Sequence, residues 1–176
     1  MKCYLYSLRL RHKDDYTHTL LQNYLAKKHP DLKDCSIVKN KDGQPFLSVK
    51  ENLFPLSISH KDTHVCIAFS KDNIYVGVDI EKISTKTLLL AKDFCEDEEI
   101  DDIERAENKE ELAALYWSMK EAVGKAYGEG LLIHPKKTYF NRTTMTVQRK
   151  GVAIPAFLKT FTKEGYVTSF VAIHRK

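Results

Sequence analysis

The amino-acid sequence predicts an α+β fold of two similar halves, each an antiparallel sheet with packed helices. Strand-like and helical segments do not alternate regularly along the chain, which argues against a doubly wound parallel sheet. Short connections such as "KDT" and "KDN" favour antiparallel neighbours. Each half combines a helix with roughly three strands. We therefore expect residues 1–78 and 79–176 to form two halves of one continuous unit.

The N-terminal half is expected to consist mostly of strands. The opening segment "MKCYLYSLRLR" alternates apolar and polar residues as a half-buried strand does. A helix is expected over residues 16–28, and the Asp-Gly pair in "KDGQP" predicts a turn. The expected strands are residues 2–9, 35–39, 56–60, 64–70 and 74–81. Short loops between the last three predict an antiparallel meander.

The C-terminal half contains the longest helical pattern. The segment "KEELAALYWSMKEAVGKAYG" predicts a helix over residues 109–128, which Gly128 and Gly130 would end. A helical stretch over residues 86–94 and an acidic segment precede it. Three further strand-like runs, with a turn at residues 163–165, complete the chain: residues 138–149, 155–163 and 166–175.

Composition limits the class of protein. The chain has 176 residues, of which 43% are hydrophobic and 30% charged, as in soluble globular proteins. No stretch approaches the ~20 apolar residues that span a bilayer, and the N-terminus lacks the apolar core of a signal peptide. The four cysteines form no CxxC pair, which favours reduced thiols. We therefore expect a cytoplasmic protein without membrane contact.

The net charge of +4 is unevenly distributed. Residues 96–111 hold ten acids and two bases, so the other 160 residues carry +12. Such a basic body should attract nucleic acid, a phosphate-rich cofactor or an acidic partner protein. One hypothesis is therefore a basic nucleic-acid-binding module. Against it, the sequence contains no helix-turn-helix spacing, zinc motif or RNA-binding signature.

The segment "IYVGVDIEKI" carries the first candidate site. Side chains alternate along a strand, so Gly77, Asp79 and Glu81 share one face. The two carboxylates then lie about 7 Å apart at their Cα atoms and suit a hard ion such as Mg²⁺. Gly77 leaves room for something bulky. The alternative is an edge strand with a solvated acidic face.

The long helix carries the second candidate site. At 100° per residue, one face holds Ala114, Trp117, Glu121, Lys125 and Gly128. This combination is unusual for a plain solvent face. Glu121 would be a metal ligand or a general base, with Lys125 and Lys120 binding phosphate. The alternative is a surface Glu–Lys pair worth about 0.3–0.5 kcal/mol.

Together the two segments resemble the paired signature of 4′-phosphopantetheinyl transferases. "GVDIE" is followed some forty residues later by "WSMKEAVGKAYGEG", which matches the family pattern W-S-x-K-E-(A/S)-x-x-K. Upstream, "RLRHKDDYTHTLL", "DGQP" and "SISH" resemble further family segments in the same order. The resemblance covers most of the chain and is strongest to the broad-specificity group that primes peptide- and polyketide-synthase carrier domains.

The resemblance implies a reaction and a set of roles. The enzyme would transfer the 4′-phosphopantetheine arm of coenzyme A to a serine of an acyl or peptidyl carrier protein, releasing 3′,5′-ADP. Asp79, Glu81 and Glu121 would hold Mg²⁺ against the pyrophosphate. Glu121 would also accept the serine proton, directly or through a water. Lys125 would contact the transferring phosphate, with Lys120 beside it.

The resemblance further places Ser59 and His60 at the nucleotide end of coenzyme A, together with Gln44, Pro45 and His18. Gln44 stands where the family usually has a phosphate-contacting lysine, and His18 where it commonly has an arginine. A basic helix usual after the first strand is also missing. Charge-assisted contacts are worth about 1.5–3 kcal/mol each. We therefore expect weakened or altered coenzyme A affinity.

The resemblance also indicates partners. In the family the segment after the metal-binding strand contacts the carrier, and here it is "KISTKTLLLAKDF". Its leucines would offer an apolar patch, or alternatively belong to the core. We expect a monomer that binds coenzyme A and a carrier protein, but no nucleic acid. A catalytically weakened member of the same fold is the remaining alternative.

Overall fold

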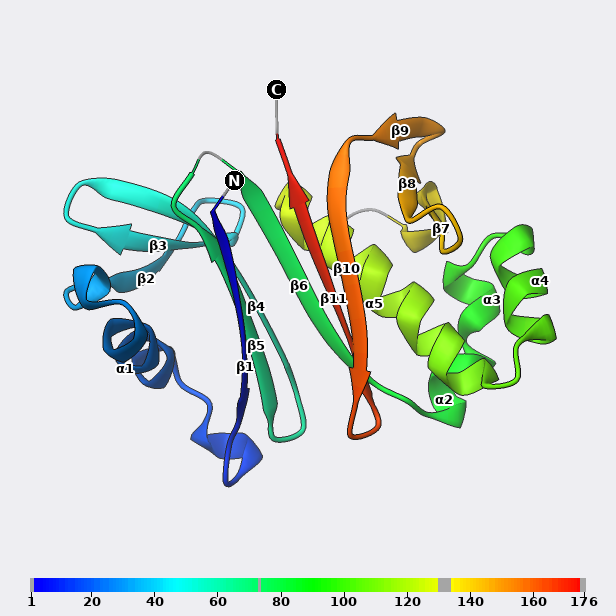
Figure 1. Ribbon diagram of the computed structural model, residues 1–176, viewed down its shortest axis with the longest axis horizontal. Coiled ribbons are helices and arrows are strands. Elements are labelled where there is room, and N and C mark those ends of the chain that lie inside the picture. Colours follow the sequence, from blue (N-terminus) through cyan, green and yellow to red (C-terminus); the bar gives the residue numbers. More distant parts are fainter. Residues whose placement is uncertain (1, 73, 130–133, 175–176) are drawn as a thin grey trace.

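The computed structural model describes residues 2–72, 74–129 and 134–174, and has a mixed α+β fold. The described residues form three antiparallel sheets and five α-helices (Figure 1). The first sheet has the strand order β1-β5-β4-β3-β2. Its strands are β1 (Cys3–Arg9), β2 (Ser36–Lys39), β3 (Pro45–Val49), β4 (Asn52–Lys61) and β5 (His64–Ser70).

Helix α1 (His18–Lys28) covers one face of the first sheet. It begins after Thr17, whose side chain accepts a hydrogen bond from the backbone N–H of Leu20. Leu21 and Leu25 of this helix are fully buried in a core that also contains the odd-numbered residues of β5. The even-numbered residues of β5 face the second sheet instead. Strand β5 is therefore apolar on both faces.

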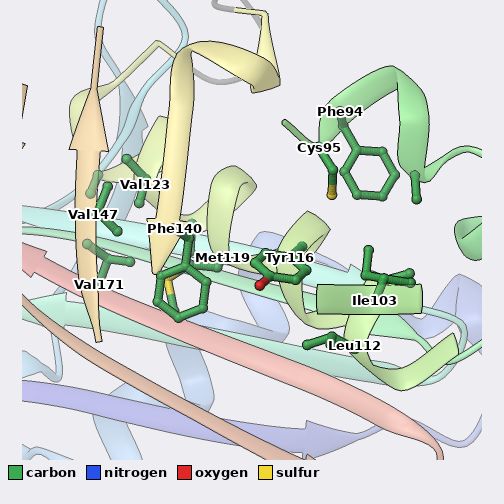
Figure 2. Packing of buried hydrophobic residues seen from close by; sticks show 14 of the residues in the cluster. Phe94, Cys95, Ile103, Leu112, Tyr116, Met119, Val123, Phe140, Val147 and Val171 are labelled. Carbon is green, nitrogen blue, oxygen red and sulfur yellow. The ribbon is translucent and has the colours of Figure 1, made fainter. Parts of the chain in front are cut away.

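The second sheet has the order β10-β11-β6, and the third has the order β7-β8-β9. Their strands are β6 (Tyr75–Lys82), β7 (Thr138–Asn141), β8 (Thr146–Arg149), β9 (Val152–Ile154), β10 (Ala156–Lys163) and β11 (Tyr166–Ile173). The remaining helices are α2 (Thr85–Leu89), α3 (Ala91–Phe94), α4 (Asp97–Arg105) and α5 (Lys109–Tyr127). Helix α5 packs against β6 and β11, and joins the smaller helices and the third sheet in one core (Figure 2).

A third core joins the two larger sheets. It contains Val76, Val78 and Ile80 of β6 together with buried residues of β5 and β11. Strand β6 lies along β4, and the backbone N–H groups of Val78 and Ile80 donate to side-chain oxygens of β4. The acceptors are Ser57 Oγ at 3.0 Å and Ser59 Oγ at 3.3 Å. These bonds fix the register between the sheets.

The predicted three-strand meander is wrong at its last strand. Strands β4 and β5 form the expected hairpin, but β6 leaves their sheet and pairs with β11. The expected boundary at residues 78 and 79 falls inside β6 and remains a prediction. The sequence pattern could not reveal the change of sheet, because the apolar face of β6, which here packs against residues of β5 and β11, would be equally compatible with a place beside β5 in its sheet.

Strands β3 and β9 were not expected from the sequence, whereas the other elements agree with it to within a few residues, with three refinements. The helix expected over residues 86–94 divides at Leu90 into α2 and α3, and the acidic segment contains α4. The run expected over residues 138–149 is the β7–β8 hairpin. All four cysteines are free thiols, as expected. None of the described helices combines the length and apolar character needed to cross a membrane.

Candidate active site

Helix α5 and strand β6 touch backbone to backbone at Gly77. A Cβ added to Gly77 would lie 1.8 Å from the carbonyl oxygen of Ala122 and 2.8 Å from the backbone nitrogen of Ala126. The room that the sequence predicts at Gly77 is thus filled by the helix itself. This close approach brings the face of α5 that carries Glu121 and Lys125 onto β6.

Asp79 lies at the centre of a buried polar network. Its side chain is 8% exposed, and its Oδ1 accepts hydrogen bonds from Ser59 Oγ at 2.8 Å and from Lys125 Nζ at 2.7 Å. Lys125 Nζ also donates to the carbonyl oxygen of Val78 at 3.2 Å. The second oxygen, Asp79 Oδ2, is buried and has no hydrogen-bond partner among the described residues. Asp79 therefore does not lie on a solvated acidic face.

Glu121 interacts with this network electrostatically. Burial, the nearby Asp79 carboxylate and, more weakly, Glu81 raise the pKa of Glu121 to about 7, although Lys125 opposes the shift. The Glu121 and Asp79 carboxyl groups therefore interact electrostatically in a poorly solvated region. A carboxyl with a pKa near neutrality can accept and release a proton near neutral pH.

Glu81 is less closely drawn into the network. Its Oε1 forms an ion pair with Lys61 Nζ at 2.7 Å. Within the described ranges, no three Asp, Glu, His or Cys side chains form a ready-made metal cluster. The three predicted ligands, Asp79, Glu81 and Glu121, thus interact electrostatically but do not form an assembled coordination shell. The carboxylate donor set and the unpartnered, buried Asp79 Oδ2 nevertheless fit a hard divalent cation.

A cleft of about 320 Å³ opens beside Lys125. Its lining comes from the β2–β3 turn, β3, β4 and the end of α5: Asp42, Gly43, Gln44, Pro45, Leu56, Ser57, Ile58, Lys125, Gly128 and Glu129. Gln44 and Pro45, which are far from Lys125 in the sequence, therefore line the same cleft as this lysine. Gly128 ends α5 with a positive φ of 73°, whereas Gly130 lies outside the described residues.

The other predicted nucleotide-end residues are dispersed around this region. Ser59 is buried, with its hydroxyl committed to Asp79, whereas His60 is exposed. The His60 ring stacks on Tyr16, with centroids 4.7 Å apart, and Tyr16 also contacts His18 edge-on at 6.3 Å. Tyr16 thus joins two predicted residues, a role that the sequence analysis missed. The sequence signal for this role was that Tyr16 lies two residues before His18.

Lys120 does not join the Asp79 network. Its ammonium forms an ion pair with Glu99 at 2.6 Å, and both side chains are 1% exposed. Glu99 also accepts hydrogen bonds from the backbone N–H groups of Glu96 and Phe140. The structure therefore corrects the expected phosphate contact: Lys120 secures α5 to α4 and β7. The available signal was that Lys120 points about 100° away from Glu121 on the helix, whereas its pairing with Glu99 depends on tertiary packing.

A second cleft, of about 470 Å³, lies at the other end of the α5 face. Trp117 lines it together with Glu81, Lys61 and Leu90, and the Trp117 ring packs on Phe94 with centroids 4.9 Å apart. The predicted face of α5, which carries Trp117, Glu121 and Lys125, therefore extends from one cleft to the other. Paired carboxylates, a neutral-range acid and a lysine between clefts are the features of an enzyme site for phosphoryl transfer.

Comparisons with known proteins agree with this class of site. Residues 75–171 match the 4′-phosphopantetheinyl transferase superfamily. The chain is 28% identical over 179 residues to the 4′-phosphopantetheinyl transferase Sfp of Bacillus subtilis (strain 168), covering 94% of this chain and 78% of that protein. It is 30% identical over 165 residues to the 4′-phosphopantetheinyl transferase ffp of Bacillus subtilis, covering 87% and 72%.

Among solved structures, the chain is similar to the holo-[acyl-carrier-protein] synthase of Thermotoga maritima. Sequence identity is 16% and the TM-score is 0.46, over 58% of this chain and 65% of that chain. The family match spans more than half of the sequence, and it contains both signature segments. The chain therefore belongs to the 4′-phosphopantetheinyl transferase superfamily and is a 4′-phosphopantetheinyl transferase, which confirms the resemblance.

Proposed function

We propose that this enzyme transfers the 4′-phosphopantetheine arm of coenzyme A to a serine of an acyl or peptidyl carrier protein. The observation that carries the proposal is the placement of Glu121, Asp79 and Lys125 in one poorly solvated network beside a cleft. The serine oxygen bonds to the β-phosphorus, and the bond from that phosphorus to the bridging oxygen breaks. The electron pair leaves with 3′,5′-ADP.

Glu121 is the proton acceptor in this proposal. In the metal-free protein the pKa of Glu121 is raised to about 7, so this carboxylate is more basic than an exposed one and is partly ionised at neutral pH. The serine hydroxyl proton moves to a Glu121 carboxylate oxygen as the new bond to phosphorus forms. Nearby Asp79 sustains this basicity because its negative charge disfavours ionisation of Glu121.

Lys125 supplies positive charge to the transferring phosphate. Its ammonium lies where the cleft meets Asp79, and its side chain is 25% exposed, so it remains accessible to an anion. Asp79, Glu121 and Glu81 would hold Mg²⁺, with Glu81 exchanging its bond to Lys61 for the ion. When bound, Mg²⁺ neutralises the pyrophosphate and stabilises the developing charge.

The cleft beside Lys125 would accept the nucleotide end of coenzyme A. Gln44 and Pro45 line it, and the ring stack of Tyr16 and His60 offers a surface for a flat base. The described lining includes the carboxylates of Asp42 and Glu129, of which Glu129 pairs with Arg149, and one cation, Lys125. This charge balance supports the proposal that coenzyme A binds more weakly here than in relatives with a basic pocket.

The carrier protein would dock next to the second cleft. Leu89 is 77% exposed and Leu90 45% exposed, so the run 88–90 presents apolar surface as well as core. Lys86 and Lys92 flank it and would steer an acidic partner. Replacing both lysines with Glu should slow transfer to a free carrier, and an unchanged rate would refute this docking site.

We further propose that the enzyme is a monomer whose halves are related by an approximate two-fold axis. In support, the β4–β5 and β10–β11 hairpins both turn at a Lys-acid pair, Lys61-Asp62 and Lys163-Glu164, and each acid pairs with a strand of the other sheet. Arg9 of β1 pairs with Glu164 of the second hairpin, and Lys82 of β6 pairs with Asp62 of the first.

The proposed reaction is tested by incubating the protein with a carrier protein, coenzyme A and Mg²⁺, followed by intact-mass measurement. We expect the carrier to gain one phosphopantetheine arm at a single serine. Glu121→Gln should abolish most of the transfer, which also distinguishes an active enzyme from a weakened member of the fold. No mass increase with any of a fatty-acid, peptide or polyketide carrier would refute the proposal.

A further inference from the structure

The proposed two-fold relation between the halves predicts two equivalent lines of contact between the two larger sheets, which we call seams. The two seams differ in the structure. The approximate two-fold axis passes between β5 and β11, where the rings of His64 and Tyr166 lie 4.2 Å apart and Cys66 Sγ lies 3.9 Å from Thr168 Oγ1. It exchanges β4 with β10 and β6 with β1. The seam between β4 and β6 therefore corresponds to a seam between β10 and β1.

Only the β4–β6 seam is closed by direct contact between its two strands. Strands β4 and β6 lie together, and Ser57 and Ser59 accept hydrogen bonds from the outer edge of β6. Strands β1 and β10 make far fewer contacts among the described residues, and Figure 1 shows β6 and β11 between them. The positions equivalent to Ser57 and Ser59 are Lys159 and Phe161, which are exposed. We give the name β1–β10 groove to the cavity that is lined by Ser7 and Arg9 of β1 and by Phe161 and Lys163 of β10.

One wall of the groove is the outer edge of β1. The backbone N–H of Leu10 donates to Thr63 at 2.7 Å, so the even-numbered residues of β1 face β5. The odd-numbered residues, Leu5, Ser7 and Arg9, consequently turn their N–H and C=O groups away from β5. Strand β1 is the last strand of its sheet in the described residues, so this edge can pair with an added strand.

The other wall is a basic and apolar face of β10. Phe157 is 50% exposed and Phe161 36% exposed, and both lie on the face that points toward the first sheet. Lys159 and Lys163 alternate with them on the same face and are also exposed. The resulting order is aromatic, cation, aromatic, cation.

A cavity of about 220 Å³ lies where the two walls meet. Ser7 and Arg9 of β1 line it together with Phe161 and Lys163 of β10, so both walls reach one ligand-sized space. Glu164 lies at its end, where it pairs with Arg9 at 3.2 Å and with Lys163 at 3.7 Å. Among the groove residues named here, the cations Arg9, Lys159 and Lys163 outnumber this single acid.

We propose that the β1–β10 groove binds an extended acidic segment of a partner protein by strand addition. The segment would pair with the N–H and C=O groups of Leu5, Ser7 and Arg9. Its same-face side chains would alternate apolar and acidic, against Phe157 or Phe161 and Lys159 or Lys163. A second copy of this chain fits poorly, because its acidic segment, residues 96–111, lies mostly in helices α4 and α5 and cannot form an added strand.

The test uses a fluorescent peptide with Val and Glu alternating on one face and Thr on the other. Anisotropy should show saturable binding to the full protein, and a scrambled peptide of equal composition should bind at least fivefold more weakly. The double variant K159E/K163E should lose about tenfold in affinity for the Glu peptide. It should gain affinity for a peptide that carries Lys in place of Glu.

A matched control reverses two other exposed lysines, K137E/K150E, and should leave peptide affinity within twofold. Hydrogen exchange at the Leu5, Ser7 and Arg9 amides should slow when the Glu peptide binds. The proposal is wrong if the wild type does not bind the peptide, or if the two double variants bind it equally. It is also wrong if the protein forms a dimer that Phe161→Ser dissociates, since a second copy would then occupy the groove.

Discussion

Replacing Gly77 with Ala should separate helix α5 from strand β6. The added methyl would lie 1.8 Å from the Ala122 carbonyl oxygen, whereas ordinary contacts begin at 3.4 Å, so the backbones must part by about 1.6 Å. Such overpacking costs about 1–3 kcal/mol. For a chain of this size the melting temperature should fall by roughly 2–12 °C.

The same displacement should impair transfer. Glu121 and Lys125 are carried by α5, and Asp79 by β6, so separating the two elements moves the proposed base from its neighbours. A misplacement of about 1 Å can cost about 10²-fold in rate. Thermal unfolding and a carrier-loading assay measure the two effects in the same preparation.

Gly151→Ala is the matched control. An added Cβ there meets nothing within 4 Å, but φ is 76°, so the variant has backbone strain without a clash. We expect about 1–2 kcal/mol of destabilisation and an unchanged transfer rate. If Gly77→Ala keeps its melting temperature and transfers within twofold of the wild type, the argument that this contact assembles the site is wrong.

Three further predictions concern titration and burial. Because the pKa of Glu121 is raised to about 7 from 4.5, the metal-free protein should lose stability as pH rises between these values. The loss should be about 1–2 kcal/mol after solvent screening. Glu121→Gln should remove it, as measured by urea unfolding at several pH values. Lys125 lowers the pKa of Glu121, so Lys125→Gln should raise the Glu121 pKa of the metal-free protein in an NMR titration, and an unmoved pKa would contradict the coupling between these two side chains. Lys120→Met leaves Glu99 buried without its cation and should lower the free energy of unfolding by about 3–5 kcal/mol. Adding Glu99→Gln should restore part of this loss. If Lys120 instead bound phosphate, Lys120→Met would raise KM without changing the melting temperature.

Much of the candidate site could be predicted from local periodicity. Alternation along the strand placed Gly77, Asp79 and Glu81 on one face, and the helical repeat placed Glu121 and Lys125 on another. These placements follow from backbone geometry, which adjacent residues determine alone. The family signature, which the comparisons confirm, depended on the same two segments.

The partners of these faces could not be read from the sequence. Strand β6 pairs with β11, nearly ninety residues later, and not with its neighbour β5, because a long-range choice of sheet leaves no mark on a short loop. Lys120 and Lys125 are both lysines of one helix, yet one is buried against Glu99 and the other reaches Asp79. Only the packed position of each side chain distinguishes them.

The sequence by itself determined which residues share a face, the free state of the cysteines and the membership of the chain in its family. The tertiary structure decided the sheet to which β6 belongs, the partner of each lysine and the raised pKa of Glu121. The physical reason is that periodicity is a local property of the backbone. Desolvation and charge pairing instead depend on which distant segments are packed together.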